Sequence, residues 1–213
     1  MGVDIHFFNV NAADADRRKE VMTTIAEVCS SHENASIKVL LHSLAFGSLL
    51  PVVASKPAAM LSQKQIEMTM DVMANSLVYW TQDVVTAGLF GKGGRIFGLT
   101  SAGSHRVLPM YGAVSAAKAA MESYIRQMAL ELAPWEITVN AIRAGVTDTP
   151  ALRKIPGNDI LIENARSRNP FHRLTTPQDV ANAMILLVRP EAGWINGTVI
   201  GIDGGEDSVD VSW

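Results

Sequence analysis

The sequence predicts an α/β fold, a doubly wound parallel sheet of the Rossmann-like type, in a single domain over residues 1–213. Short apolar runs that end in small and polar residues alternate with helical patterns along the chain. A strand, helix, strand succession requires parallel pairing and a right-handed crossover. With 48% apolar and 18% charged residues, a chain of 213 residues suits one domain with a substantial core.

Turn and capping signals give the order of the elements. Ser62-Gln-Lys-Gln65 is a capping box that begins a long helix, and Thr176 followed by Pro177 begins the last one. The Gly-Lys-Gly-Gly run at 91–94 is interpreted as a plain turn rather than a phosphate loop, since a strand follows it. Strands are expected at 4–10, 37–41, 95–100, 137–142 and 197–202, and further helices after Asp14, over 116–132 and around 159–166.

Charge and cysteine content exclude several classes of protein. The net charge of −3 offers no basic face for nucleic acid, and no apolar run is long enough to span a membrane. A single cysteine, Cys29, suits a reducing compartment, and the N-terminus has no signal-peptide pattern, so a cytoplasmic protein is expected. The five histidines lack metal-binding spacing, so no metal site is expected.

The stretch from Tyr111 to Lys118 carries the clearest candidate chemistry. Two helical turns nearly repeat at seven residues, so this tyrosine and lysine share one face at the start of a helix. A phenol beside a cation is a plausible proton donor, because the cation favours the phenolate and lowers the tyrosine pKa. The structural alternative is a boundary tyrosine and a surface lysine.

Three predicted strands end in small and polar residues, at His42–Ala45, Thr100–Ala102 and Ala144–Val146. Ligands of doubly wound sheets bind outside the carboxyl ends of the strands, so these segments are expected to converge on Tyr111. Residues 146–175 have no firm strand, and a segment of this length after a strand end is expected to form a substrate lid.

Four motifs together resemble the short-chain dehydrogenase/reductase family, and within it the enoyl-acyl-carrier-protein reductases that prefer NADPH. His-Ser-Leu-Ala at 42–45 is similar to the His-Ser-Ile-Gly/Ala of those reductases, and Tyr111 and Lys118 have their spacing. Segments 141–145 and 200–205 resemble the nicotinamide-lining segment and the closing strand. The resemblance implies reduction of a trans-2-enoyl thioester with NADPH or NADH in fatty acid synthesis.

The resemblance also implies roles for individual residues. Tyr111 would donate a hydrogen bond or proton to the thioester oxygen, and Lys118 would hold the nicotinamide ribose. Ser101 is the candidate substitute for a second tyrosine, whose position Ala102 takes, and Met73 replaces the family's proton-relaying asparagine. Besides Lys118, the implied cofactor contacts are Asn11, Ser43, Leu44, Ala45, Gly145, Val146, Thr147 and Thr149.

Some of these positions have structural alternatives. Ser43 and Ala45 are also typical of small residues that end a strand, and Thr149 is also typical of a helix cap before Pro150. Five apolar residues of the lid would cover an acyl chain or merely pack: Leu152, Ile155, Ile160, Leu161 and Phe171.

The family's opening unit, with its Gly-rich turn, has no counterpart before Asp4, so the expected domain is N-terminally truncated. A fragment, a wrongly started gene product and a natural remnant are the three interpretations. Asp4–Val10 then pairs with Ile37–Leu41, stands apart, or borrows strands from another chain.

Three functions remain open at this point. The first is an enoyl-thioester reductase, the second a related reductase of 3-ketoacyl thioesters or small carbonyls, and the third a non-catalytic remnant or oligomerising subunit. The Tyr111 and Lys118 pair favours the first two, and the missing Gly-rich unit favours the third. The expected partners are an acyl carrier protein or CoA thioester and further copies of the chain, as a homodimer or homotetramer.

Overall fold

A four-stranded parallel sheet organises the computed structural model, which describes residues 3–155 and 157–209. The strands lie in the order β1-β2-β3-β4, and each neighbouring pair is parallel. Their bounds are β1 Ile37–His42, β2 Phe90–Thr100, β3 Thr138–Ala144 and β4 Val199–Ile202. The predicted α/β fold with a parallel sheet is confirmed.

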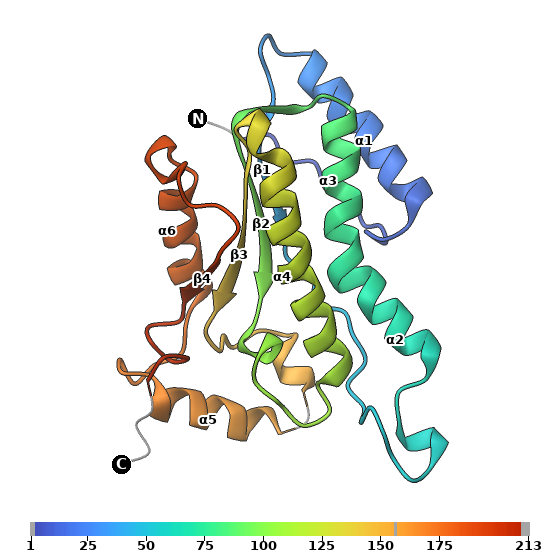
Figure 1. Cartoon of the computed structure of the whole chain (residues 1–213), viewed down its shortest axis with the longest axis vertical. Helices are drawn as coiled ribbons and strands as arrows, with labels where there is room; N and C mark the ends of the chain where they lie inside the picture. Colours follow the sequence, from blue (N-terminus) through green and yellow to red (C-terminus); the bar gives the residue numbers. More distant parts are fainter. Residues whose placement is uncertain (1–2, 156, 210–213) are drawn as a thin grey trace.

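Helices connect the strands and cover the sheet. Figure 1 shows α3 and α4 side by side, with α4 packed on β2 and β3, whereas α6 lies beside β4 at the other edge. The helices are α1 Ala15–Ser30, α2 Gln63–Met70, α3 Ser76–Thr86, α4 Gly112–Leu132, α5 Asn158–Arg168 and α6 Pro177–Leu187. In the described part of the chain, none of them is both long and apolar enough to cross a membrane.

The core forms where α4 packs on β3. Apolar residues of α4 recur at steps of four and three, and every member of this stripe is buried: Ala117, Met121, Ile125, Met128 and Leu132. Val139 and Ala141 of β3, both without exposed surface, belong to the same core cluster. Because such a stripe loses its apolar area to the sheet, packing fixes the helix rather than propensity alone.

The capping signals act as predicted. The Ser62 side chain accepts a hydrogen bond from the Gln65 backbone, and the Gln65 side chain accepts one from the Ser62 backbone. Thr176 and Asp179 form the same reciprocal box before α6, with Pro177 in the first turn. These bonds satisfy backbone N–H groups that have no partner inside the helix, so both helices begin where the sequence indicates.

The predicted long helix after Ser62 is interrupted by a π-helical segment, Asp71–Asn75, between α2 and α3. Met73 and Ala74 of this segment are buried in the core. A π-helical turn changes the direction of the side chains that follow it, and such turns are frequent at functional sites.

Two of the predictions about strands and turns are wrong. Residues 4–10 form no strand, and Ile5 and Phe7 are 85% and 86% exposed. An extended segment becomes a strand only when a neighbour takes up its backbone N–H and C=O groups, and among the described residues β1 pairs with β2 alone. Of the three arrangements expected for this segment, it stands apart.

The glycine-rich run at 91–94 is the second correction, because it is a bulge inside β2 and not a separate turn. Ile37 pairs with Phe90 and Val39 with Arg95, so a two-residue step on β1 faces a five-residue step on β2. Gly93 accommodates the extra residues with a φ of 70°, which glycine adopts without steric cost.

Candidate active site

Two cavities meet at Tyr111, at the edge where the strands end. The mouth cavity, of about 450 Å³, is lined by the segment after β1, the π-helical segment, the start of α4 and the segment after β3. The inner cavity, of about 150 Å³, is lined by the ends of β2 and β3 and the turn after β4. Tyr111, Leu152 and Ile155 line both cavities, so Tyr111 stands in the wall between them. Figure 1 shows α5 beyond this end of the strands.

Tyr111 precedes the first residue of α4, and its side chain is largely shielded from water. Burial raises the pKa of the Tyr111 phenol, and a hydrogen bond with the Ser101 side chain opposes this rise in part. The expectation that a neighbouring cation lowers this pKa is therefore wrong, because loss of hydration is the larger effect. The phenol keeps its proton at neutral pH, which suits a hydrogen-bond or proton donor.

Lys118 is buried, with 5% of its surface exposed, so the surface-lysine alternative is wrong. Its ammonium group donates hydrogen bonds to the backbone oxygens of Leu99 and Leu44, which lie at the ends of neighbouring strands. Burial lowers the pKa of Lys118 to about 8, and the Glu122 carboxylate opposes that shift. Lys118 thus joins the two strand ends from behind the cavity wall.

Ser101 lies where the sequence analysis expects it, directly beside Tyr111. It precedes the short 3-10 turn Ala102–Ser104, and its hydroxyl accepts a hydrogen bond from the Gly103 backbone at 3.1 Å. A Cβ atom on Gly103 would meet the Tyr111 ring, so glycine is the residue that lets the ring approach this turn. Ser101 and Tyr111 both line the inner cavity.

The predicted cofactor residues fall into three groups. Ala45, Thr147 and Thr149 line the mouth cavity, and Gly145 and Val146 line the inner cavity. Ser43 and Leu44 follow β1 without lining either cavity, although the Leu44 oxygen accepts from Lys118. Asn11 is set apart in the turn before α1, where its side-chain oxygen accepts from the Ala13 backbone at 3.1 Å.

Structural roles are visible for three of these residues. The Thr149 hydroxyl accepts from the Leu152 backbone at 3.1 Å, which is the helix-capping alternative. The Thr147 hydroxyl donates to the Gly145 oxygen at 2.9 Å. A side chain on Gly145 would collide with Thr175, so close packing also requires glycine there. Thr147 and Thr149 serve the backbone and still face the cavity.

The expected lid is only partly over the site. Leu152 and Ile155 line both cavities, and Leu161 lines the inner one. Ile160 and Phe171 are 68% and 71% exposed and line neither cavity, so their covering of a ligand stays a prediction. Helical periodicity explains the split within α5, because neighbouring residues face different directions.

An ionic cluster after β4 was missed at the sequence level. Asp207 lies 2.6 Å from Arg106, 2.9 Å from His105 and 3.2 Å from Arg143. Glu206 accepts from the Val146 backbone at 3.0 Å, and burial raises the pKa of its carboxyl group. The one available signal was two acidic residues shortly after the closing strand, whose partners lie about 60 to 100 positions earlier.

His42 is a second residue whose role was missed. Its Nε2 lies 2.8 Å from the Ser76 hydroxyl, which itself donates to the Val72 oxygen, so the imidazole must donate to Ser76. Burial and the charge of Lys118 lower the pKa of His42 to about 4, which keeps it neutral. Its Nδ1 has no hydrogen-bond partner in the part of the chain that the structure describes.

Apart from Lys154, the remaining wall of the mouth cavity is mostly apolar. Met73, which the motif resemblance aligns with the family's relaying asparagine, is 2% exposed and lies in this wall. Within residues 3–155 and 157–209, no group of three or more His, Cys, Asp or Glu residues is arranged to hold a metal ion. The cavity therefore combines the Tyr111 phenol, two threonine hydroxyls, the Lys154 side chain and an apolar surface.

Known proteins of one family match this chain over nearly its whole length. The family model described as "Enoyl-(Acyl carrier protein) reductase" matches residues 3–206. The NADH-dependent enoyl-[acyl-carrier-protein] reductase of Aquifex aeolicus is 31% identical over 171 residues, which are 80% of this chain and 62% of that relative. The chloroplastic enzyme of Arabidopsis thaliana is 33% identical over 189 residues, 88% of this chain and 47% of that relative.

A crystal structure supports the same assignment. That of the Aquifex aeolicus VF5 enzyme superposes with a TM-score of 0.82 at 27% sequence identity, covering 94% of this chain and 75% of that one. The two curated relatives described above are longer, and the chain spans less than two thirds of the length of each. Because the family model matches from residue 3 to residue 206, this chain belongs to the enoyl-(acyl carrier protein) reductase family.

Proposed function

We propose that this chain reduces the double bond of a trans-2-enoyl thioester with NADH or NADPH, as a step of fatty acid synthesis. The observation that carries the proposal is the position of Tyr111, whose protonated phenol lies in the wall of a 450 Å³ cavity with an apolar surface. An acyl chain requires such a surface, and the thioester oxygen requires a donor within it.

The residues behind Tyr111 fit the nicotinamide end of the cofactor. Lys118 has three N–H donors and uses two of them on backbone oxygens, which leaves one for a ribose hydroxyl. Thr147 and Thr149 face the same cavity with their side chains and can meet the carboxamide. When bound, the cofactor supplies a hydride.

Tyr111 then acts on the oxygen of the thioester. As negative charge develops on that oxygen, the neutral phenol donates a hydrogen bond to it and can deliver its proton. Met73, Leu152 and Ile155 exclude water from this part of the cavity, which strengthens the bond. Ser101 positions the phenol from the other side of the wall.

NADH is the first cofactor to test. The names of the Aquifex and Arabidopsis relatives give NADH, whereas the motif resemblance favours the NADPH-preferring branch. An acyl carrier protein thioester is the proposed substrate, because those relatives act on this carrier by name. A cytoplasmic location and a homodimeric or homotetrameric assembly complete the proposal.

Cofactor binding tests the proposal before any turnover is measured. Titration of the purified chain with NADH, followed by nicotinamide fluorescence, should give saturable binding, and Lys118→Met should weaken it by about tenfold through loss of a charged donor. The exposed Lys64→Met is the matched control and should bind as the wild type does. Absence of binding of NADH and NADPH at millimolar concentration would exclude both reductase functions for this chain.

A further inference from the structure

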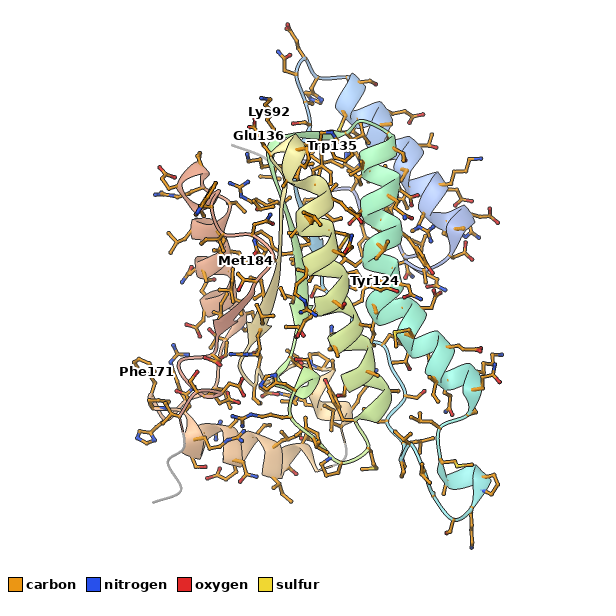
Figure 2. The ribbon with its side chains drawn as sticks, viewed as in Figure 1. Lys92, Tyr124, Trp135, Glu136, Phe171 and Met184 are labelled. Carbon is orange, nitrogen blue, oxygen red and sulfur yellow. The ribbon has the colours of Figure 1, made fainter. Side chains whose placement is uncertain are left out.

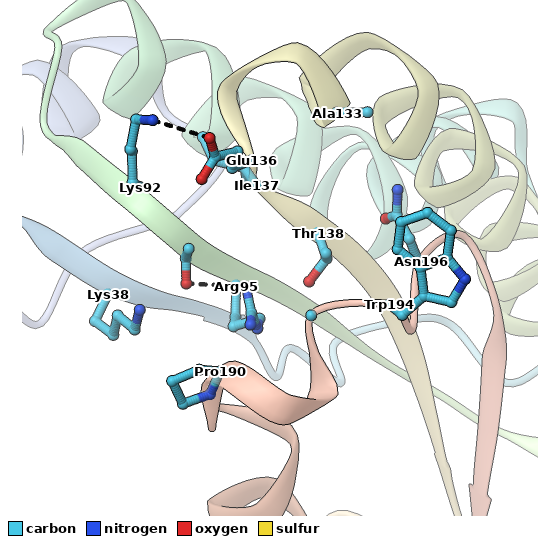
Figure 3. Close-up of a pocket in the computed structure, with 12 residues that line it drawn as sticks. Lys38, Lys92, Arg95, Ala133, Glu136, Ile137, Thr138, Pro190, Trp194 and Asn196 are labelled. Atoms are coloured by element: carbon cyan, nitrogen blue, oxygen red, sulfur yellow. Dashed lines mark hydrogen bonds and ion pairs between the residues drawn. The ribbon is translucent and has the colours of Figure 1, made fainter.

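A third cavity, of about 750 Å³, opens at the opposite edge of the sheet, where the strands begin. Figure 3 shows its residues: Lys38 of β1, Lys92, Gly93 and Arg95 of β2, Ala133, Glu136, Ile137 and Thr138 around the start of β3, and Pro190, Gly193, Trp194 and Asn196 after α6. Figure 2 shows Lys92 and Glu136 together at this end of the molecule, with Phe171 near the other end. We call it the amino-edge cavity. It contains the glycine-rich bulge, which the proposed function does not use.

Positive charge accumulates in the amino-edge cavity. Lys92 is neutralised by Glu136 at 2.9 Å, but Lys38 and Arg95 have no ion pair within residues 3–155 and 157–209. Arg95 is only 3% exposed, and its guanidinium donates to four backbone oxygens, of Gly93, Gly94, Leu187 and Arg189. Carbonyl dipoles solvate this charge without cancelling it, so an anion in the cavity is favoured.

The bulge in β2 contacts both cations that lack an ion pair, Lys38 and Arg95. Gly93 has a φ of 70°, and a Cβ atom there would lie 3.0 Å from the Lys38 ammonium. The ammonium therefore lies against Gly93, whose backbone oxygen accepts a hydrogen bond from Arg95. A larger residue at position 93 would displace Lys38 from this place.

Thr138 supplies an independent indication of a ligand. It is 6% exposed, and its hydroxyl has no hydrogen-bond partner among the residues that the structure describes. Figure 3 shows this hydroxyl directed into the cavity, on the side of Arg95 and Pro190. A buried hydroxyl without a partner is unfavourable, and an acceptor atom inside the cavity removes that cost.

Trp194 adds a flat apolar surface to the rim. It is 98% exposed, and Figure 3 places its indole beside Asn196 at the opposite side of the cavity from Lys38. An indole that stacks on a planar ring gains stabilisation beyond that from the buried area. The cavity thus offers a cationic wall, a buried hydroxyl and an aromatic rim.

From these contacts we propose that the amino-edge cavity binds a small organic anion that carries a planar ring. The anionic group lies between the Lys38 ammonium and the Thr138 hydroxyl, and the ring lies against Trp194. The site is separate from the Tyr111 cavities, so its occupation does not depend on the proposed reductase activity. Phosphate and carboxylate share the required chemistry.

Calorimetric titration of the whole chain tests the site with two ring-bearing anions, phenyl phosphate and benzoate, which distinguish the two anionic groups. Phenol and inorganic phosphate represent the ring and the anionic group of phenyl phosphate separately. We expect at least one ring-bearing anion to bind, and phenyl phosphate, if it is the one, to bind more tightly than phenol or inorganic phosphate. Binding should weaken as the salt concentration rises.

Substitutions locate the binding. Lys38→Met should raise the dissociation constant by about tenfold, and Thr138→Val by about fivefold, because each removes a donor to a charged group. Lys64→Met, on exposed α2, is the matched control and should have no effect. Thr138→Ser, which keeps the hydroxyl, should bind as the wild type does and guards against a packing effect.

Three outcomes would overturn the proposal. One is the absence of saturable binding by both ring-bearing anions. Another is binding that is unchanged in Lys38→Met and Thr138→Val. The third is a fall in subunit number in Trp194→Leu, measured by analytical ultracentrifugation, together with no ligand binding, since this would make the rim a contact between copies of the chain.

Discussion

Tyr111 illustrates how burial decides the chemistry of a single residue. The seven-residue step to Lys118 suggested a phenol tuned by a cation, but the ammonium is engaged with the oxygens of Leu44 and Leu99. The pKa of Tyr111 is instead raised by lost hydration. A donor that keeps its proton is what an oxygen with developing negative charge requires.

His42 is buried in its neutral form, and the fold therefore opposes its protonation. Its pKa falls to about 4 in the folded chain, from 6.5 in an exposed histidine. The folded state binds fewer protons than the unfolded state between these values. Stability from this group is thus complete above pH 6.5 and is lost as the pH falls towards 4.

Acid titration should reveal this contribution. The free energy of unfolding should fall by about 3 kcal/mol between pH 7 and pH 4 through His42 alone. Urea unfolding at a series of pH values measures it, and His42→Gln should remove most of that loss. His32→Gln, an exposed control, should keep it. An equal acid sensitivity in all three proteins would contradict the assignment.

Single residues show what the sequence reveals about the site and what it does not. Tyr111, Ser101 and Val146 were identifiable because strand ends of a parallel sheet converge, whereas Thr147 came from the family resemblance alone. Asp207 was not identifiable, because its partners Arg106 and Arg143 reach it only after folding. Directions of pKa shifts were equally out of reach, since burial is a property of the tertiary structure.

At the scale of elements, local signals fixed the helices better than the strands. Capping boxes lie within one turn, so Ser62 and Thr176 mark their helices directly. A strand depends on a distant neighbour, so residues 4–10 have the composition of a strand but form none. The bulge at 91–94 depends on the register between β1 and β2, which no short-range pattern contains.

Two glycines allow the bulge to be tested. Gly93 and Gly88 have φ values of 70° and 66°, so alanine at either position should destabilise the fold by about 1–2 kcal/mol in urea unfolding. A Cβ atom would meet Lys38 at Gly93, whereas nothing lies within 4 Å at Gly88. Gly93→Ala alone should therefore weaken phenyl phosphate or benzoate binding. Equal binding by the two variants would separate the bulge from the amino-edge cavity.

At the scale of the whole molecule, the parallel sheet gives the chain two chemically different edges. The carboxyl ends of β1, β2 and β3 bring together residues from positions 45 to 207 around Tyr111. The amino-terminal ends gather Lys38, Arg95 and Thr138 around the other cavity. Because the sheet separates the edges, substitutions in one cavity should leave ligand binding in the other unchanged.

The rate of NADH oxidation with a crotonyl thioester tests the central claim most directly. The account predicts that the wild-type chain oxidises NADH with this substrate and not with an acetoacetyl thioester. Tyr111→Phe should lose at least about 100-fold in rate while remaining folded, because the developing charge loses its donor. The Tyr79 hydroxyl donates a hydrogen bond to Asp71 away from the cavities, so Tyr79→Phe should keep the full rate. Full activity in Tyr111→Phe, or no NADH oxidation by the wild type, would contradict the account.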